Sequence, residues 1–173
     1  PRKIFKHFLG KPVENDELIF EEKDETFTCS ISLTSDEKYF IISTSDHITT
    51  EEYFFESNTS EIKPKLFKKR KKDVRYSLDS WQEYFYIHTN ENARDYKILR
   101  CKKNNIETLE QFISPKKETV IGGLDFLDEY IIRSEKSDAI PRLYVRNIKT
   151  NKEEEIKISD ETIGVPGVSL MQK

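Results

Sequence analysis

Carboxylates are concentrated near the start of the chain, in the stretch DELIFEEKDETF at residues 16–27. The six acids of this stretch are Asp16, Glu17, Glu21, Glu22, Asp24 and Glu25. Acids at this density could bind a cation, act as a general acid and base, or keep a strand in solution. A calcium loop of the EF-hand type needs oxygen ligands at alternating positions and a central glycine, which residues 21–32 lack. Glycosidic cleavage needs two carboxyl groups at a fixed separation, one of them with a raised pKa, and acids in a flexible connector offer neither. We therefore expect no metal site and no catalysis from these acids.

The other residues with chemical potential also lack the spacing of known motifs. His7, His47 and His88 form no H-E-x-x-H or other ligand pattern, and His88, near the end of an expected strand, is typical of a core or rim position. No G-x-S-x-G nucleophile elbow is present. Gly122-Gly123 is too short for a phosphate cradle and favours a strand bend where backbones pack closely. We therefore predict no catalytic residue, no cofactor-binding residue and no metal ligand in this chain.

Composition indicates a folded, β-rich protein with a heavily charged surface. Hydrophobic and charged residues each make up 35% of the 173 residues, and aromatics reach 12%, whereas disordered chains are poor in aromatics. Cys29 and Cys101 lie far apart and form no C-x-x-C pair, so reduced thiols in a cytoplasmic protein are the simplest interpretation. No apolar run is long enough to span a membrane, so no membrane partner is expected. The start at Pro1 is neither an initiator methionine nor a signal peptide, which suggests a chain cut from something longer.

A repeat organises the chain. Three segments share a polar lead-in, an aromatic and aliphatic run, and then small polar residues: EKYFIISTSD (37–46), QEYFYIHTNE (82–91) and LDEYIIRSEK (127–136). Their aligned residues Phe40, Phe85 and Tyr130 recur every 45 residues. A period of roughly 40–45 residues is the length of one four-stranded propeller blade.

Each repeat reads as four short strands separated by polar turns. In the second repeat the expected strands are 73–78, 84–89, 96–100 and 109–113, all rich in β-branched and aromatic residues. The sequence therefore predicts an all-β fold, a partial β-propeller of about three four-stranded blades near residues 26–68, 73–113 and 118–158. The end of another blade precedes them and the start of one follows. Three blades cannot close a ring and would leave two sheet edges open, so the chain is expected to be a fragment of a propeller domain.

The repeat gives the acidic stretch a place. Residues 18–20 become an outer strand, and residues 21–25 become the connector to the next blade. One repeat later the connector is KKRKK at residues 68–72, so neighbouring blades present oppositely charged loops at one rim. Either these are solvated connectors with weak pairing worth at most about 1 kcal/mol, or they guide a charged peptide. A nuclear signal or a nucleic-acid patch is a third interpretation of the basic run, but the formal net charge of −3 and the acidic partner weaken it.

An ordered set of stretches resembles the propeller of the oligopeptidase B (protease II) group in the prolyl oligopeptidase family of serine peptidases. The stretches are KHFLG (6–10), DELIFEEKDETF (16–27), RKKDVRYSLD (70–79), FYIHTNENARDYKILR (85–100) and ISPKKETVIGGLDFLDEYIIRSE (113–135). The resemblance spans nearly the whole chain and is weakest over residues 149–173. Each motif is modestly specific, and the ordered set is much more so.

The resemblance implies a seven-bladed propeller joined to an α/β-hydrolase domain that carries the catalytic Ser, Asp and His. The family cleaves short peptides, the oligopeptidase B group does so after Arg and Lys, and the propeller caps the active site. The hydrolase domain has no counterpart in these residues, so Glu21 and Asp24 inherit no role and the chain alone is expected to be inactive. Its expected partners are the missing hydrolase domain of the same polypeptide and, in the intact enzyme, short basic peptides, with no nucleic acid or cofactor. The alternative is a stand-alone β-propeller-like protein-interaction module.

Overall fold

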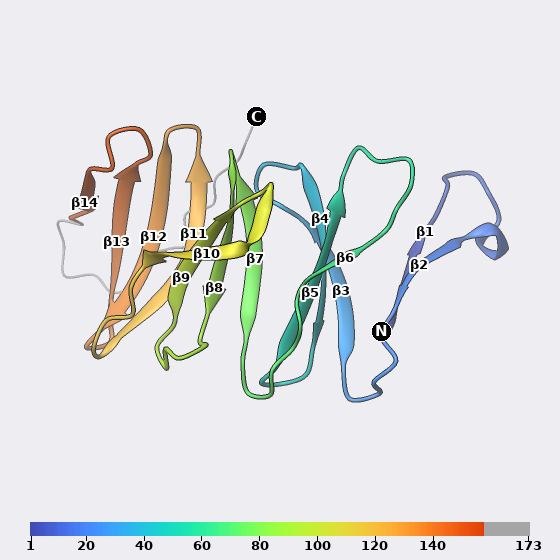
Figure 1. The fold of residues 1–173 in the computed structure, drawn as a ribbon, viewed down its shortest axis with the longest axis horizontal. Coiled ribbons are helices and arrows are strands. Elements are labelled where there is room, and N and C mark those ends of the chain that lie inside the picture. Colours follow the sequence, from blue (N-terminus) through green and yellow to red (C-terminus); the bar gives the residue numbers. More distant parts are fainter. Residues whose placement is uncertain (158–173) are drawn as a thin grey trace. The chain divides into compact units, whose positions relative to one another are not determined.

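The computed structural model describes residues 1–157, which form fourteen β-strands and one short 3-10 turn (Val13–Asn15) (Figure 1). The N-terminal hairpin consists of β1 (Lys3–Lys6) and β2 (Glu17–Glu21). The first sheet contains β3 (Thr28–Leu33), β4 (Tyr39–Ser45), β5 (Thr50–Glu56) and β6 (Lys65–Lys68). The second sheet contains β7 (Tyr76–Trp81), β8 (Tyr84–Thr89), β9 (Lys97–Lys102) and β10 (Asn105–Ile113). The third sheet contains β11 (Thr119–Leu127), β12 (Tyr130–Ser137), β13 (Ile140–Asn147) and β14 (Glu153–Glu155).

Each four-stranded sheet is an antiparallel meander whose strands pair in sequence order (Figure 1). The predicted all-β fold class is confirmed, and the segment 105–113, which contains the expected strand 109–113, is strand β10. The part of the chain that the structure describes falls into two compact units, one of residues 1–114 and one that begins at Pro115. The first unit holds the hairpin and the first two sheets, and the third sheet belongs to the second unit.

Residues with left-handed backbone lie in several of the turns between strands. Asn92 and Asn151 adopt φ values of 53° and 57°, the left-handed region that asparagine tolerates, in the polar turns NEN (90–92) and KTNKE (149–153). The predicted strand at 73–78 begins later, at Tyr76. Asp73 has a φ of 64°, which is incompatible with a strand, so the chain turns there before β7 starts.

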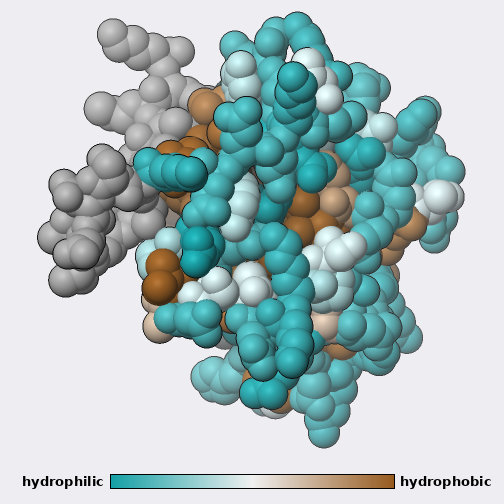
Figure 2. All heavy atoms as spheres, turned by 90° about the vertical axis from the view of Figure 1, so that its left-hand side faces the viewer, coloured by the Kyte–Doolittle hydropathy of each residue, from teal (hydrophilic) through white to brown (hydrophobic). Residues whose placement is uncertain are grey.

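The core of the first unit lies among β4, β7, β8 and β9. Its buried members are Ile41, Tyr76, Leu78, Phe85, Ile87 and Cys101. Phe85 is fully buried, and its ring centroid lies 4.9 Å from that of Tyr39 and 5.1 Å from that of Phe54. Aromatic residues from both sheets therefore meet around one side chain, which explains how a chain with few aliphatic residues builds a core. The face of the molecule in Figure 2 is mostly hydrophilic, with smaller hydrophobic patches.

The glycine pair lies at an irregularity of the third sheet, as its sequence predicted. The register between β11 and β12 shifts between Ile121 and Leu124. A Cβ atom added at Gly122 would overlap the Ser134 hydroxyl and lie 3.0 Å from the Ser134 carbonyl oxygen, whereas one added at Gly123 would meet nothing within 4 Å. Only Gly122 is therefore required for the close approach of the two strands.

We expect Gly122→Ala to lower the free energy of unfolding of the third sheet by about 1–3 kcal/mol, because the new methyl group must push β12 away. Gly123→Ala is the matched control and should change it by less than about 0.5 kcal/mol. Chemical denaturation of the two variants measures the difference. Adding Ser134→Gly to Gly122→Ala should restore part of the loss, and equal stability of the two alanine variants would refute the argument from close approach.

Candidate functional site: charged clusters between and within the sheets

Arg70, in the basic connector between β6 and β7, is held by two acids. Its Nη2 atom donates to Oε2 of Glu22 at 2.7 Å, and its Nε atom lies 3.3 Å from Oε1 of Glu51. The Arg70 backbone N–H donates to Oε2 of Glu51 at 2.7 Å. The guanidinium also lies over the Phe27 ring, with Cζ 4.0 Å from the ring centroid. We call Glu22, Phe27, Glu51 and Arg70 the Arg70 clamp, since it joins the connector before β3, strand β5 and the connector before β7.

The clamp is shielded from water. The Glu22 and Glu51 side chains are 5% and 6% exposed, and Arg70 is 27% exposed. Burial alone would lower the pKa of Arg70, but the hydrogen bond to Glu22 and the charge of Glu51 outweigh it and raise that pKa. The Tyr53 hydroxyl donates to Oε1 of Glu51 at 2.9 Å, and burial together with this carboxylate raises the pKa of Tyr53 to about 12. Arg70 therefore stays charged, and the Tyr53 phenol at the edge of the clamp stays neutral near pH 7.

The interpretation of the two connectors as merely solvated is wrong at Glu22 and Arg70. The 45-residue repeat aligns the two connectors in the sequence. The packing of consecutive sheets then brings Glu22 of one connector and Arg70 of the other into an ion pair that is shielded from water. The rest of the acidic connector is exposed, with surface ion pairs such as Arg2 to Glu25 at 3.4 Å. In the basic connector, Lys68 and Lys71 pair with Glu91, whereas Lys69 is exposed and forms no ion pair with any residue of 1–157. Whether the exposed charges guide peptides stays a prediction.

Two aspartates form a second polar cluster between the first and second sheets. Asp36 accepts hydrogen bonds from Oγ of Ser80 at 2.5 Å and from Nζ of Lys103 at 2.6 Å. Asp79 accepts from the backbone N–H and the hydroxyl of Ser35 at 2.8 and 2.6 Å. Burial would raise the pKa of Asp36, but Lys103 and the hydroxyl donors lower it below its usual value, whereas burial dominates at Asp79 and raises its pKa. The two sheets of the first unit are thus joined by charge-assisted hydrogen bonds beside their aromatic core.

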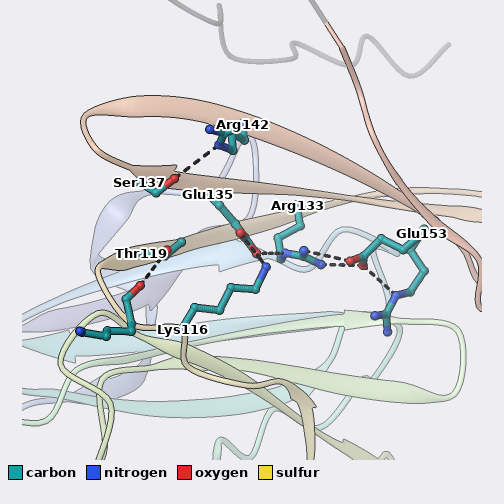
Figure 3. Close-up of polar contacts among 9 residues, drawn as sticks. Lys116, Thr119, Arg133, Glu135, Ser137, Arg142 and Glu153 are labelled. Atoms are coloured by element: carbon teal, nitrogen blue, oxygen red, sulfur yellow. Dashed lines mark hydrogen bonds and ion pairs between the residues drawn. The ribbon is translucent and has the colours of Figure 1, made fainter.

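The third sheet contains a buried ion network of its own (Figure 3). Arg133 on β12 is 3% exposed and donates through Nε to Oε1 of Glu135 at 2.9 Å. Its Nη1 and Nη2 atoms donate to the two carboxylate oxygens of Glu153 at 2.6 and 3.0 Å, the bidentate geometry that suits a guanidinium. Lys116 binds both oxygens of Glu135, at 2.7 and 2.8 Å, and Nε of Arg146 donates to Glu153 at 3.0 Å. We call these five residues the Arg133 network.

Charge balance explains how this network tolerates burial. Burial alone would lower the pKa of Arg133, but Glu153 and Glu135 outweigh it and raise that pKa. Burial would raise the pKa of Glu153, and Arg133 and Arg146 reverse this and lower it. The Arg133 guanidinium also lies 4.7 Å from the centroid of the Tyr144 ring. Each buried charge has an opposite charge and a hydrogen bond, as a stable buried pair requires.

The histidines and cysteines predicted to lack chemical roles are dispersed. His7 bonds to Asp16 at 2.6 Å in the hairpin, His47 is exposed in the turn before β5, and the His88 ring stacks on Tyr96 at 4.5 Å between centroids. Cys29 and Cys101 are buried free thiols, and burial raises the pKa of Cys101 to about 11. Within residues 1–157 no three metal-ligating side chains cluster, and no helix could span a membrane. The absence of catalytic, cofactor and metal sites stays a prediction.

Sequence reasoning missed the Arg133 network, although a signal for it exists. In a strand, residues two apart share a face, so Arg133 and Glu135 share the face of the buried Ile131. Opposite charges at such spacing on a buried face predict an internal ion pair. Glu153 carried no comparable signal, because its role depends on β14 reaching a strand two positions away in the sheet.

Comparison with known proteins identifies the arrangement of meander sheets. The family model of the prolyl oligopeptidase N-terminal β-propeller domain matches residues 1–172. The chain belongs to this family. The resemblance noted in the sequence is thereby confirmed.

Relatives of this propeller family are much longer than the chain. Protease 2 of Moraxella lacunata is 31% identical over 133 residues, which cover 76% of this chain and 19% of that protein. Dipeptidyl aminopeptidase BI of Pseudoxanthomonas mexicana is 24% identical, covering 97% of this chain and 23% of that protein. The chain therefore spans about a fifth to a quarter of the length of these relatives.

Solved structures show the same propeller fold. Oligopeptidase B from Trypanosoma brucei, in a closed form with covalently bound antipain, superposes with a TM-score of 0.83 at 16% identity over 92% of this chain and 24% of that one. Oligopeptidase B from Leishmania major superposes with the same values. At such identity the likeness concerns the fold alone.

Proposed function

We propose that this chain is a non-catalytic part of the propeller cap of a serine-type oligopeptidase. The observation that carries the proposal is the match of the propeller family model to residues 1–172. The 31% identity to Protease 2 of Moraxella lacunata supports a peptidase of that kind as the parent. The parent would hydrolyse short peptides after Arg or Lys through an acyl-enzyme formed by a serine of an α/β-hydrolase domain in the same polypeptide. As part of a cytoplasmic enzyme, the chain would face short basic peptides and no nucleic acid.

The physical role proposed for the propeller is selection by size. A sheet-built wall with charge-assisted bonds between its sheets holds its shape while substrate enters and leaves. Closing such a wall over an active site removes water and excludes folded proteins. The chain supplies part of this wall and none of the reacting groups.

The test uses the longer polypeptide that contains this chain. It should hydrolyse a dipeptide ester ending in Arg, leave the matching ester ending in Glu nearly untouched, and lose activity with a serine-directed inhibitor. The 173-residue chain alone should give no turnover. Turnover by the chain alone would overturn the non-catalytic role, and a gene that stops after Lys173 would favour the stand-alone interaction module.

A further inference from the structure

Glu52 is a buried acid that has no cation beside it. It lies on β5 and is 3% exposed. The Ser43 hydroxyl on β4 donates to its Oε1 atom at 2.5 Å, whereas its buried Oε2 atom has no partner in hydrogen-bonding geometry within residues 1–157. A carboxylate in such surroundings carries a desolvation cost that its few hydrogen bonds only partly offset, and a neutral carboxyl group largely avoids that cost.

The strands packed against Glu52 supply no positive charge that faces it. Lys68 on β6 is its register partner, but the ammonium group of Lys68 pairs with Glu91. On β7, Asp79 adds negative charge, and the pKa of Tyr76 is raised mainly by burial, so its phenol stays neutral. On β5 itself, the neighbouring Glu51 is bound by Arg70. Burial is the largest influence on the pKa of Glu52 and raises it, and the charge of Asp79 raises it further. The hydrogen bonds from the Ser43 hydroxyl and the Leu78 backbone lower it only in part, so the pKa of Glu52 rises to about 7.

Glu52 lies where the first sheet is bonded to the second. Its backbone N–H donates to the Tyr76 hydroxyl at 2.9 Å, and that hydroxyl donates to the Lys68 carbonyl at 2.6 Å. Thr50 exchanges two hydrogen bonds with the Tyr76 backbone, at 2.8 and 2.6 Å. We call these bonds the β5–β7 seam. A negative charge appearing on Glu52 would lie in this seam, close to Asp79.

We propose that Glu52 is a proton-binding site that closes the β5–β7 seam when it is neutral and loosens it when it ionises. The propeller would therefore become more mobile between its first two sheets as the solution turns alkaline. The proposal does not depend on the activity of the parent enzyme. It assigns a role to a charged residue that the composition alone would place on the surface.

The sign of the effect follows from linkage. Between the ordinary pKa of 4.5 and the folded value of about 7, the folded chain holds a proton that the unfolded chain has lost. The stabilisation that Glu52 contributes is fully present below its pKa in the unfolded chain. It is lost as the pH rises through its pKa in the folded chain. The unfolding equilibrium constant should rise by a factor on the order of one hundred across this window.

Carbon-13 NMR of the glutamate carboxyl groups in the 173-residue chain, with Glu52 assigned, measures its titration directly. Amide hydrogen exchange, expressed as protection factors, reports on the seam at Glu52 and Tyr76 over pH 5.5–8.5. We expect Glu52 to titrate near neutrality and seam protection to fall in the same range. In Glu52→Gln the pH-dependent loss should disappear, and in the control Glu56→Gln, at the exposed end of the same strand, it should persist.

Two results would overturn the proposal. One is titration of Glu52 near the ordinary value of a glutamate, which needs no variant and therefore decides the matter even if Glu52→Gln does not fold. The other is seam protection that falls with pH equally in the wild type and in Glu52→Gln. An Asp79→Asn variant isolates the contribution of the neighbouring aspartate to the titration of Glu52. It should shift that titration to lower pH without abolishing it.

Discussion

Replacing Arg133 with alanine is expected to destabilise the third sheet by about 3–5 kcal/mol. The change removes a cation that is 3% exposed and leaves the buried carboxylate of Glu135 and the half-buried carboxylate of Glu153 without their central partner. Lys116 and Arg146 still touch these acids, and Lys116 also lies 5.1 Å from the centroid of the Tyr144 ring, but neither replaces the guanidinium that bridges Glu135 and Glu153. Denaturant unfolding, followed by hydrogen exchange of the β12 amides, measures the loss.

Arg142→Ala is the matched control for this prediction. Arg142 lies on the adjacent strand β13, is 39% exposed and pairs with Glu155 at 3.1 Å, so its loss should cost less than about 1 kcal/mol. A second variant, Arg133→Met with Glu135→Leu, replaces a buried pair with apolar side chains and should recover much of the stability. If Arg133→Ala costs no more than Arg142→Ala, the buried network does not stabilise the sheet.

The sequence predicted the sheets because their pattern is local and repeated. Aromatic and β-branched runs such as YFYIHT, recurring every 45 residues and separated by polar turns, specify meander strands without any knowledge of tertiary contacts. The ends of the strands were harder to predict from the sequence. The start of β7 depends on the left-handed backbone at Asp73, whose N–H donates to Thr49 of the preceding sheet at 3.2 Å.

The charged clusters could be predicted only in part, because they depend on distances between strands and sheets. The period showed that the connectors containing Glu22 and Arg70 occupy similar positions in consecutive repeats. It did not show that Glu51 on β5 would complete the pair. Glu52 was hidden for a different reason, since the strand TEEYFFE is buried on both faces near its start and alternation therefore does not distinguish inward from outward acids.

Arg70→Ala is expected to lower the free energy of unfolding of residues 1–114 by about 3 kcal/mol. The change leaves the carboxylates of Glu22 and Glu51, which are 5% and 6% exposed, without the cation that they bind. It also removes the cation over the Phe27 ring. Denaturant titrations of the variant and of the wild type at pH 7 measure the loss.

Lys69→Ala is the control, because Lys69 is the adjacent exposed cation and its loss should change stability by less than about 0.5 kcal/mol. This contrast also decides how peptide guidance by the basic connector must be tested. Reversing the charge of Arg70 would break the clamp and alter peptide selectivity through misfolding alone, whereas Lys69→Glu changes the rim charge and leaves the clamp intact. Equal stability of Arg70→Ala and Lys69→Ala would show that the clamp contributes nothing to the free energy of unfolding.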